Sequence, residues 1–496
     1  MADHFPCSLV WLRRDLRLDD HVALFHAAAR SERVVLAFVL DPALLRGPRV
    51  GAPIVQFFFD SLAELRERLR ALGSDLALLE GDFATELIRL ARHVDARAVF
   101  FNGDYDPAMA ARDTAAIAAL RDAQLETHAY VDHVYVRAED VVQANGKPYT
   151  VYTPYRKRWN ARIAEQPRAP YRSRDGLAAK LLPAAGIGRT RDVPKPEAYG
   201  HASSERYPHG GAIEAQRLLD AFVAEGANAY LDRRNVPAVE GTSRLSPHLR
   251  AGTIGIRTCM SAALDARARR RSSFATNIDG WIGELTWRDF YQQLLVHFPR
   301  VAHEPFIENA KDIAWRGDER AWDAWTTGTT GYPIVDAAMI QLNETGWMHN
   351  RLRMIVASFL TKHLLIDYHD VERYFEQHLA DADLGANNGG WQWSASTGTD
   401  AAPYFRVFNP ILQSEKFDPR GAFIRRMIPA LARVPDAYVH APWTMPPIVA
   451  ADCGVAIGQT YPAPIVEHAF ARERALAVFA RALKRPVSTT AFLSSP

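Results

Sequence analysis

The sequence contains little cysteine and no long apolar run. Its three cysteines, Cys7, Cys259 and Cys453, are far apart, so neither a disulfide framework nor a zinc site is expected. No stretch reaches the ~18 consecutive apolar residues of a membrane span, and the first residues lack the basic and apolar regions of a signal peptide. These absences predict a protein without metal or membrane contact, and we expect it in the cytoplasm.

An excess of charge of one sign is also missing. The formal net charge is +2, so any nucleic-acid binding must depend on a local basic surface. The chain has 496 residues, of which 48% are hydrophobic, which is enough for two or three domains. No long exposed apolar stripe indicates a partner subunit, and a monomer is expected.

Residues 1–140 are predicted to form an α/β domain with a parallel sheet. Short β-branched runs alternate there with amphipathic segments such as residues 55–72. No G-x-G-x-x-G follows the first strand, which runs into Arg13 and Arg14, so the sheet is expected to be Rossmann-like without the dinucleotide fingerprint. The predicted strands are CSLVWL, RVVLAFVL, DLALLEG, RAVFF and HAYVDHVYV.

Beyond the sheet the chain changes character twice. In residues 141–205 the periodicity fails and prolines accompany a basic stretch, which indicates a long interdomain connection over the surface. Residues 206–485 carry helical patterns and are predicted to form an all-helical domain, followed by a tail at 486–496. The clearest apolar stripe consists of Leu352, Ile355, Val356, Phe359 and Leu360.

Four segments of the helical region concentrate polar residues, glycine and tryptophan. The first, residues 240–252, places hydroxyls and an arginine ahead of a helix, a pattern typical of a phosphate site or of an ordinary helix cap. In the second, Trp281, Glu284 and Arg288 share a helical face and Trp287 lies beside them. A core tryptophan with a peripheral salt bridge would give the same pattern.

The third segment groups Asn350, Arg351 and Met354 on one side of a helix, and leaves Arg353 to pair with an acid elsewhere. The fourth, residues 381–410, is the most specific. On its own, its D-x-D sequence indicates the metal motif of a sugar transferase, but a helix and not a strand precedes it.

Together and in this order, the four segments resemble the flavin-binding domain of the photolyase and cryptochrome family. The similarity extends from about Ala229 to Pro429, and the pattern is most similar to that of the class I enzymes. The resemblance implies FAD as cofactor, DNA containing pyrimidine dimers as partner, and light-driven dimer splitting by an electron from excited reduced FAD. A cryptochrome-type blue-light photoreceptor is the main alternative.

The resemblance also implies which residues hold FAD. Phosphate contacts are expected from Tyr230 and from the hydroxyl-rich loop, Arg353 is expected to pair with Asp381, and Asn387 is expected to face N5 of the flavin. The full implied set is Tyr230, Thr242, Ser243, Arg244, Leu245, Ser246, Trp281, Arg288, Asn350, Arg353, Asp381, Ala382, Asp383 and Asn387.

A second implied set binds the lesion and the DNA. Trp287 and Trp393 match the two rings that wall the lesion pocket, and Glu284 matches the carboxyl group that hydrogen-bonds the dimer. Relatives that repair 6-4 photoproducts carry histidine near Met354, which favours the cyclobutane dimer here. The full implied set is Arg234, Glu284, Trp287, Arg351, Met354, Trp393, Arg406 and Lys416.

The sequence departs from the family pattern in its electron chain. Trp391 and Trp315 match the inner and outer members of a three-tryptophan chain that reduces the flavin, but the middle position is Tyr368. Tyrosine is a poor relay without a proton acceptor. We therefore expect slower flavin photoreduction or a detour through Trp325.

A second departure concerns the light-harvesting antenna of the α/β domain. Folate-binding relatives carry an Asn-Glu pair where this chain has Ala108 and Met109, and a Cys-Lys pair where it has Ala302 and His303. A second chromophore is expected, and a deazaflavin or a second flavin is favoured over folate.

Overall fold

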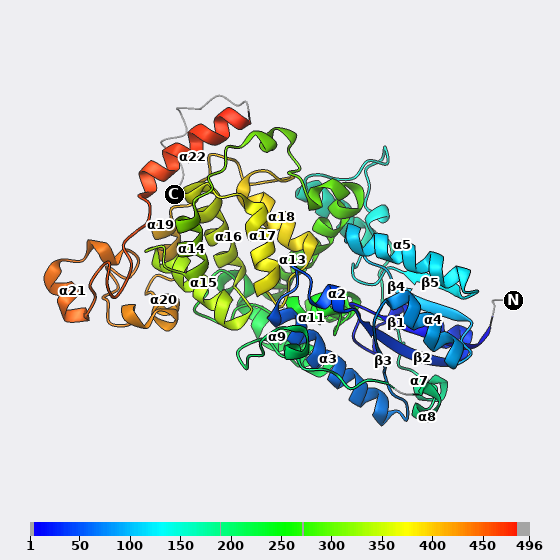
Figure 1. The fold of residues 1–496 in the computed structure, drawn as a ribbon. Coiled ribbons are helices and arrows are strands. Elements are labelled where there is room, and N and C mark those ends of the chain that lie inside the picture. Colours follow the sequence, from blue (N-terminus) through cyan, green and yellow to red (C-terminus); the bar gives the residue numbers. More distant parts are fainter. Residues whose placement is uncertain (1–3, 189, 270–271, 484–496) are drawn as a thin grey trace. The chain divides into compact units, whose positions relative to one another are not determined.

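The computed structural model describes residues 4–188, 190–269 and 272–483, and the chain divides into two compact units (Figure 1). Unit 1 comprises Met1–Tyr230, Thr242–Pro299 and Glu376–Ala386. Unit 2 comprises Leu231–Gly241, Arg300–Phe375 and Asn387–Pro496. No helix within the described ranges is both long and apolar enough to cross a bilayer.

Unit 1 contains a five-stranded parallel sheet of order β3-β2-β1-β4-β5. Its central strands are apolar on both faces, as a sheet covered by helices on both sides requires. Trp11 is paired with Ala37 on one side and with Phe101 on the other. The strands are β1 (Phe5–Leu12), β2 (Ser31–Leu40), β3 (Ala77–Glu80), β4 (Ala98–Asn102) and β5 (Glu126–Tyr130).

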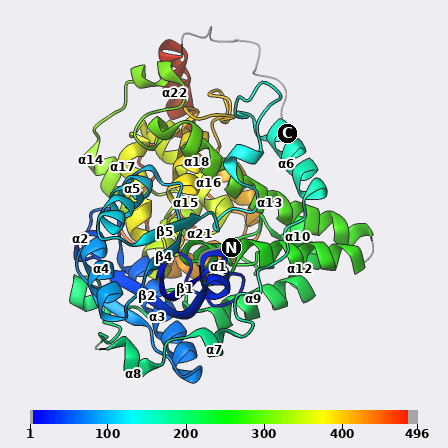
Figure 2. The same ribbon diagram turned by 90° about the vertical axis from the view of Figure 1, so that its right-hand side faces the viewer.

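The strand order reverses between β1 and β4, so their carboxyl ends form the topological switch point of the sheet. This arrangement confirms the predicted parallel α/β domain. The helices that connect or follow the strands are α1 (Val22–Arg30), α2 (Pro42–Leu45), α3 (Ala52–Ala71), α4 (Phe83–His93) and α5 (Pro107–Asp122), and Figure 2 shows them around the strands.

A close backbone contact fixes the start of α3. A Cβ atom on Gly51 would lie 1.6 Å from the Gln377 carbonyl oxygen, so only glycine fits there. Pro53 follows in the first turn, where its fixed φ favours the helix and its missing N–H costs nothing.

The rest of unit 1 is helical. Within residues 141–205, α6 buries Tyr155 and Trp159 completely against Phe290 of α13 and its neighbours. The helices of this part are α6 (Tyr152–Glu165), α7 (Leu177–Lys180), α8 (Ala184–Ile187), α9 (Ala212–Ala224), α10 (Tyr230–Arg233), α11 (Ser246–Ala251), α12 (Ile256–Arg269) and α13 (Ser272–His297), of which α10 extends into unit 2.

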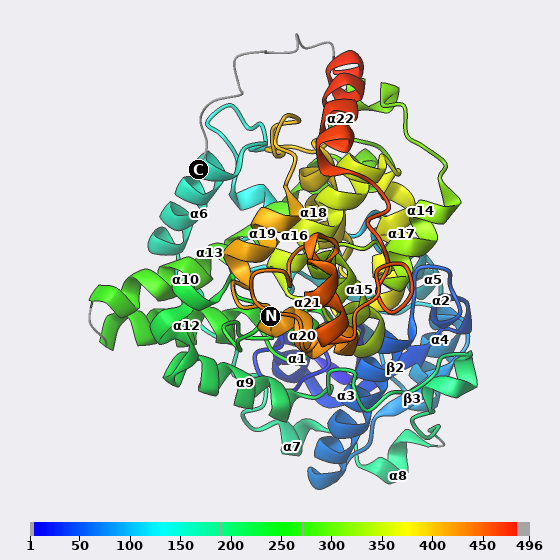
Figure 3. The same cartoon turned by 90° about the vertical axis from the view of Figure 1, so that its left-hand side faces the viewer.

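Unit 2 is built from helices, and α16 continues into a π-helical turn, η6 (Phe359–Leu364). Helices α20 and α21 lie next to each other in Figures 1 and 3. The helical second half of the chain was predicted and is confirmed. The helices are α14 (Glu319–Thr327), α15 (Pro333–Thr345), α16 (Asn350–Ser358), α17 (Tyr368–His378), α18 (Leu384–Ala395), α19 (Pro410–Phe417), α20 (Ala422–Met427), α21 (Pro447–Cys453) and α22 (His468–Ala482), of which α17 and α18 extend into unit 1.

Candidate functional site

The hydroxyl-rich loop before α11 presents its polar groups outward. Thr242 and Ser243 are half-buried and Ser246 is exposed, whereas Leu245 is buried in the helical core of unit 1. Arg244 has a φ of 53°, a left-handed conformation that a non-glycine residue keeps only when its surroundings fix it. Hydroxyl groups beside an arginine in a fixed loop suit a phosphate ligand chemically.

The aromatic residues of α13 lie in two different environments. Trp281 is 3% exposed and packs against Phe222 at a ring distance of 4.9 Å, so it is a member of the core. Trp287 is half-buried and stacks on Tyr152 at 3.5 Å with an interplanar angle of 6°. Glu284 is half-buried on the same helix. The second environment therefore offers a ring and a carboxyl group near the protein surface.

Asp383 is the centre of a buried ion cluster in unit 1. It pairs with Arg14, and its Oδ1 accepts a hydrogen bond of 2.6 Å from Gln292 Nε2. Burial alone would raise the pKa of Asp383, but the charges of Arg14, Arg288 and Arg250 lower it to about 2. This carboxyl group is therefore a fixed anion at neutral pH.

Sequence reasoning missed two arginines of this cluster. Arg14 also pairs with Asp104 at 2.9 Å, and Arg250 donates to the Ala382 carbonyl oxygen. Arg288 donates to the carbonyl oxygen of His133. The only signal in the sequence was the Arg-Arg-Asp run after the first strand, which became informative once the fold placed it beside Asp383.

Two buried polar atoms of this cluster have no hydrogen-bond partner among the described residues. They are Nη1 of Arg250 and Oε1 of Gln292. A ligand rich in hydroxyl groups would satisfy both atoms, at a site where burial without a partner costs ~1–3 kcal/mol each. Together with the hydroxyl-rich loop, this donor set fits a polyhydroxylated phosphate-bearing cofactor such as FAD.

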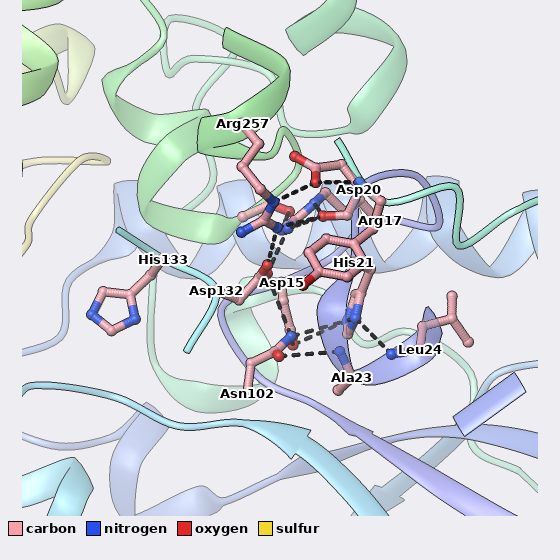
Figure 4. Close-up of polar contacts among 12 residues, drawn as sticks. Asp15, Arg17, Asp20, His21, Ala23, Leu24, Asn102, Asp132, His133 and Arg257 are labelled. Carbon is pink, nitrogen blue, oxygen red and sulfur yellow. Dashed lines mark hydrogen bonds and ion pairs between the residues drawn. The ribbon is translucent and has the colours of Figure 1, made fainter. Parts of the chain in front are cut away.

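A second buried network occupies the switch point of the sheet (Figure 4). Arg17 pairs with Asp132 at 2.5 Å, and Arg257 pairs with both Asp132 and Asp20. The charges of Arg17, Arg257 and His21 outweigh burial and lower the pKa of Asp132. Burial is the largest single influence and by itself would raise the pKa of Asp132. The ion pairs therefore keep this carboxyl group charged.

The same network extends to the ends of β1 and β4. His21 Nε2 lies 3.1 Å from Asp15 Oδ2, and Asn102 Nδ2 donates to the same carboxyl group at 2.8 Å. The crevice beside it has a volume of about 10 Å³, which is room for one water molecule. The chain's own ion pairs therefore fill the place where open α/β sheets commonly bind ligands.

In unit 2, α16 presents the predicted polar group on one side. Arg351 donates to Asn235 Oδ1 at 2.9 Å, and its guanidinium lies 4.3 Å from the ring centre of Phe417. Asn350 is exposed and its Nδ2 lies 4.0 Å from the sulfur of Met354. The structure thus brings these three residues together, as the helical spacing predicted.

Basic residues accompany this side of α16. Burial and the charge of Arg234 lower the pKa of Arg351, so these two arginines are near one another. Arg406 and Lys416 are exposed. Arg353 donates to the carbonyl oxygen of Met348 at 2.9 Å. Its predicted pairing with Asp381 joins the two units and stays a prediction.

Helix α18 carries the remaining predicted residues. Asn387 is half-buried and donates to the carbonyl oxygen of Glu372 at 2.9 Å. Trp391 is buried and Trp393 is half-buried. Trp393 is thus the more accessible of the two rings, as a ligand contact requires.

The structure does not support a metal site at the D-x-D sequence, Asp381 to Asp383. Asp383 is committed to Arg14 and Gln292, and within the described part of the chain no group of three or more His, Cys, Asp and Glu residues could hold a metal ion. The sugar-transferase alternative has no structural basis.

Two family models match most of the chain. The model described as the FAD binding domain of DNA photolyase matches residues 281–481, and the model described as DNA photolyase matches residues 8–172. Among curated proteins, a deoxyribodipyrimidine photo-lyase of Synechococcus sp. is 41% identical over 463 residues, which cover 93% of this chain and 93% of that protein.

Three solved structures have the same fold. A bacterial class III photolyase from Agrobacterium tumefaciens is 36% identical, with a TM-score of 0.87 and coverage of 98% of both chains. An archaeal photolyase from Sulfolobus tokodaii with two FAD molecules is 30% identical, with a TM-score of 0.79 over 96% of this chain and 100% of that one. A Synechocystis cryptochrome is 26% identical, with a TM-score of 0.85 over 96% of this chain and 100% of that one.

Proposed function

The chain belongs to the DNA photolyase and cryptochrome family, and from this membership we propose that it repairs cyclobutane pyrimidine dimers in DNA with light. The observation that carries the proposal is the combination of a cofactor donor set with two accessible tryptophans, Trp287 and Trp393. The cofactor donor set holds a flavin, and the two tryptophans suit a base lesion that has been turned out of the stack.

The cofactor is FAD, which when bound and reduced supplies a photoexcited electron. Thr242, Ser243 and Ser246 hold its phosphate groups, because these hydroxyl-bearing residues are half-buried or exposed at the start of α11, beside the fixed backbone of Arg244. Arg250 and Gln292 bind its hydroxyl groups through the atoms that lack partners. The anionic Asp383 stays charged and holds Arg14 in place beside them.

Further FAD contacts are proposed from the family pattern. Asn387 orients the flavin edge, and Asp381 pairs with Arg353. A neutral amide at Asn387 places no ionisable proton there, which suits an enzyme that works from a fully reduced flavin. The other proposed contacts are Tyr230, Arg244, Leu245, Trp281, Arg288, Asn350 and Ala382.

The lesion is proposed to stack on Trp287 and on Trp393. Turning a dimer out of the duplex costs a few kcal/mol, and the damage itself lowers this cost. Each stacking contact returns ~1–3 kcal/mol without reading the base. Glu284 hydrogen-bonds the dimer, and Met354 offers an apolar surface where an enzyme for 6-4 photoproducts would need a proton donor.

Backbone phosphates of the DNA contact the basic residues of unit 2. Arg234, Arg351, Arg406 and Lys416 are proposed for this role. Each phosphate contact on duplex DNA should contribute a slope of about −0.9 to the dependence of log affinity on log salt. A salt-independent affinity would place the DNA elsewhere.

We assign the enzyme to class I and favour a flavin-type antenna. The class assignment rests on the four segments of the helical region alone, since a class III photolyase is also 36% identical to this chain. A second flavin has a precedent in the Sulfolobus tokodaii structure with two FAD molecules. Chromophore extraction from the purified protein, followed by mass spectrometry, would identify the antenna.

The test is blue-light repair of an oligonucleotide with one cyclobutane thymine dimer, using protein whose flavin has been chemically reduced. Dark samples and an oligonucleotide with a 6-4 photoproduct serve as controls. Loss of the cyclobutane dimer in light alone supports the proposal. No loss with reduced flavin bound would favour the photoreceptor alternative, and loss of the 6-4 product would overturn the lesion assignment.

A further inference from the structure

A row of aromatic rings in unit 2 connects Trp391 with Trp322. The ring centres of Trp391 and Trp325 are 6.3 Å apart, and those of Trp325 and Trp322 are 6.1 Å apart. Phe375 packs against both inner tryptophans, at 4.9 Å from Trp391 and 6.1 Å from Trp325. Successive tryptophan ring centres along the row are therefore no more than 6.3 Å apart.

The row runs from the interior to the surface. Trp391 and Trp325 are 3% and 0% exposed, whereas Trp322 is half-buried. Trp322 and Trp325 are three residues apart on α14, which places both rings on one helical face. The indole of Trp325 donates to the Val356 carbonyl oxygen at 3.2 Å, so this ring is held in place.

The other candidate path contains a phenol. The ring of Tyr368 lies 6.4 Å from that of Trp315. An oxidised phenol is strongly acidic, so tyrosine gives up an electron readily only when a neighbouring base takes its proton. The hydroxyl groups of Tyr368 and Thr397 are buried beside one another, and neither forms a well-aligned hydrogen bond among the described residues. Thr397 is not a base. Burial and the charges of Glu372 and Asp367 raise the pKa of Tyr368, but neither carboxyl group accepts a hydrogen bond from its hydroxyl, so no base among the described residues is bonded to the phenol.

A histidine also lies against the Tyr368 ring. His369 stacks on it with ring centres 4.1 Å apart, and His369 Nδ1 lies 2.8 Å from Asp367 Oδ1. Burial opposes the charged form, but the bond to Asp367 and its charge raise the pKa of His369. When protonated, His369 opposes a positive charge on Tyr368, and the carboxylates of Asp367 and Glu372 offset part of this effect.

We propose that electrons reach the flavin site through Trp322, Trp325 and Trp391, and that Tyr368 and Trp315 lie outside the working path. The inference rests on the proposed function, in which Trp391 is the ring next to FAD. Electron tunnelling slows exponentially with distance, and the spacings of 6.1 and 6.3 Å in this row are similar to the 6.4 Å between Tyr368 and Trp315, so the row is favoured because all three of its members are indoles. Two exposed carboxylates, Glu319 and Asp323, flank Trp322 in α14 and favour a positive charge at the exit.

The electrons balance over one cycle. A bound, photoexcited oxidised flavin would take one electron from Trp391. Trp325 then reduces Trp391, and Trp322 reduces Trp325. A thiol in solution reduces the oxidised Trp322 and loses its own proton to water. The chain itself is unchanged at the end, and one electron has moved from the thiol to the cofactor.

The experiment uses the full-length flavin-loaded protein with its flavin oxidised. A laser flash is followed by absorbance of the oxidised tryptophan, with and without thiol, in Trp325→Phe, Trp322→Phe, Tyr368→Phe and Trp443→Phe variants. Trp443 is the matched control, because it is half-buried in unit 2 and packs against Tyr332. Phenylalanine keeps the apolar packing and removes the easily oxidised ring.

We expect Trp325→Phe to lower the yield of long-lived oxidised tryptophan by at least about tenfold, the effect of ~1.4 kcal/mol on one step. Trp322→Phe should slow the reduction by thiol about tenfold, since the charge then stops at a buried ring. Trp322 is half-buried, so this variant also serves if Trp325→Phe folds poorly. Tyr368→Phe and Trp443→Phe should both stay within about twofold of the native protein.

The route is overturned if Tyr368→Phe lowers the yield and Trp325→Phe does not. It is also overturned if a spin trap, located by peptide mass spectrometry, labels Trp315 and leaves Trp322 unlabelled. Repair by chemically reduced protein is measured separately. If the reduced protein repairs DNA but the spin trap does not label Trp322, only the proposed route is contradicted. If the spin trap labels Trp322 but the reduced protein does not repair DNA, only the proposed function is contradicted.

Discussion

The buried polar groups of unit 1 and of unit 2 have different partners. In unit 1, Arg257 and Arg17 are paired with Asp132, so charge meets opposite charge. In unit 2, the fully buried Lys362 donates to the Ser396 hydroxyl at 2.9 Å and to the Ala395 carbonyl at 3.3 Å. Its amine lies 3.4 Å from the ring centre of Phe479.

The difference separates two tasks. Paired ions in unit 1 hold the switch point of the sheet and the cofactor donors in fixed positions. Unit 2 gives its buried Lys362 neutral partners, and burial lowers the pKa of Lys362 so that the amine tends toward its neutral form. Glu319 and Asp323, the carboxylates beside Trp322, are exposed, where water and salt screen their charges.

The largest expected effect comes from breaking a pair in unit 1. Asp132→Ala leaves Arg17 buried without a carboxylate and Arg257 with Asp20 alone, and should lower the free energy of unfolding by about 3–5 kcal/mol. Urea unfolding followed by circular dichroism measures the change. Asp19→Ala is the control, because Asp19 is 60% exposed in its pair with Arg68, and its loss should stay within about 0.5 kcal/mol. A loss below about 1 kcal/mol for Asp132→Ala would show that the network does not hold the unit.

A second prediction separates stacking from electron transfer. Trp287 of unit 1 stacks on Tyr152 and is proposed to contact the lesion, not to carry electrons. Trp287→Ala should weaken binding of dimer-containing DNA in the dark by about 1–3 kcal/mol. Fluorescence anisotropy measures this affinity, with undamaged DNA as the reference ligand. An equal loss for undamaged DNA would mean that the ring contacts the backbone and not the dimer.

A third change sharpens the contrast within unit 2. Tyr368→Trp supplies a second row of indoles, so flavin photoreduction should become faster, by less than about tenfold because the Trp325 row already works. Steady-state flavin absorbance under blue light measures the rate. Equal rates in the native protein and the variant would contradict the view that Tyr368 limits its own path.

The smallest expected effect is the pH dependence of Lys362. Its pKa is lowered in the folded protein, so between that value and about 10.4 the unfolded chain binds more protons. Stability of the native protein relative to Lys362→Met should therefore rise with pH in this window and level off above it. The stabilisation by Asp132 changes in an acidic window instead. Because the pKa of Asp132 is lowered in the folded protein, its stabilisation is complete above about pH 3.9 and is lost as the pH falls. A flat alkaline difference would show that the Lys362 amine stays charged.

Patterns local in sequence predicted the architecture well. Alternating apolar runs and helical segments predicted the parallel sheet, and the 3.6-residue period predicted the helices of the second half. The same period placed Asn350, Arg351 and Met354 on one side of α16. These features depend on backbone geometry and on burial, which short stretches of sequence already specify.

Contacts between distant residues could not be predicted in this way. Arg14 and Asp383 are 369 positions apart, and no spacing rule pairs them. The orphaned atoms of Arg250 and Gln292 appear only when the packing around them is known. The contacts of Trp325 with both Trp391 and Trp322 likewise depend on how α14 packs in unit 2.

The most direct test combines both regions in one assay. Native protein and Trp325→Phe are each mixed with DNA that carries a single cyclobutane dimer and illuminated with blue light, once after chemical reduction of the flavin and once from the oxidised state with a thiol present. Our account predicts equal repair by both proteins after chemical reduction, and repair by the native protein alone from the oxidised state. Equal repair from the oxidised state would contradict the electron path, and no repair by either reduced protein would contradict the enzyme function.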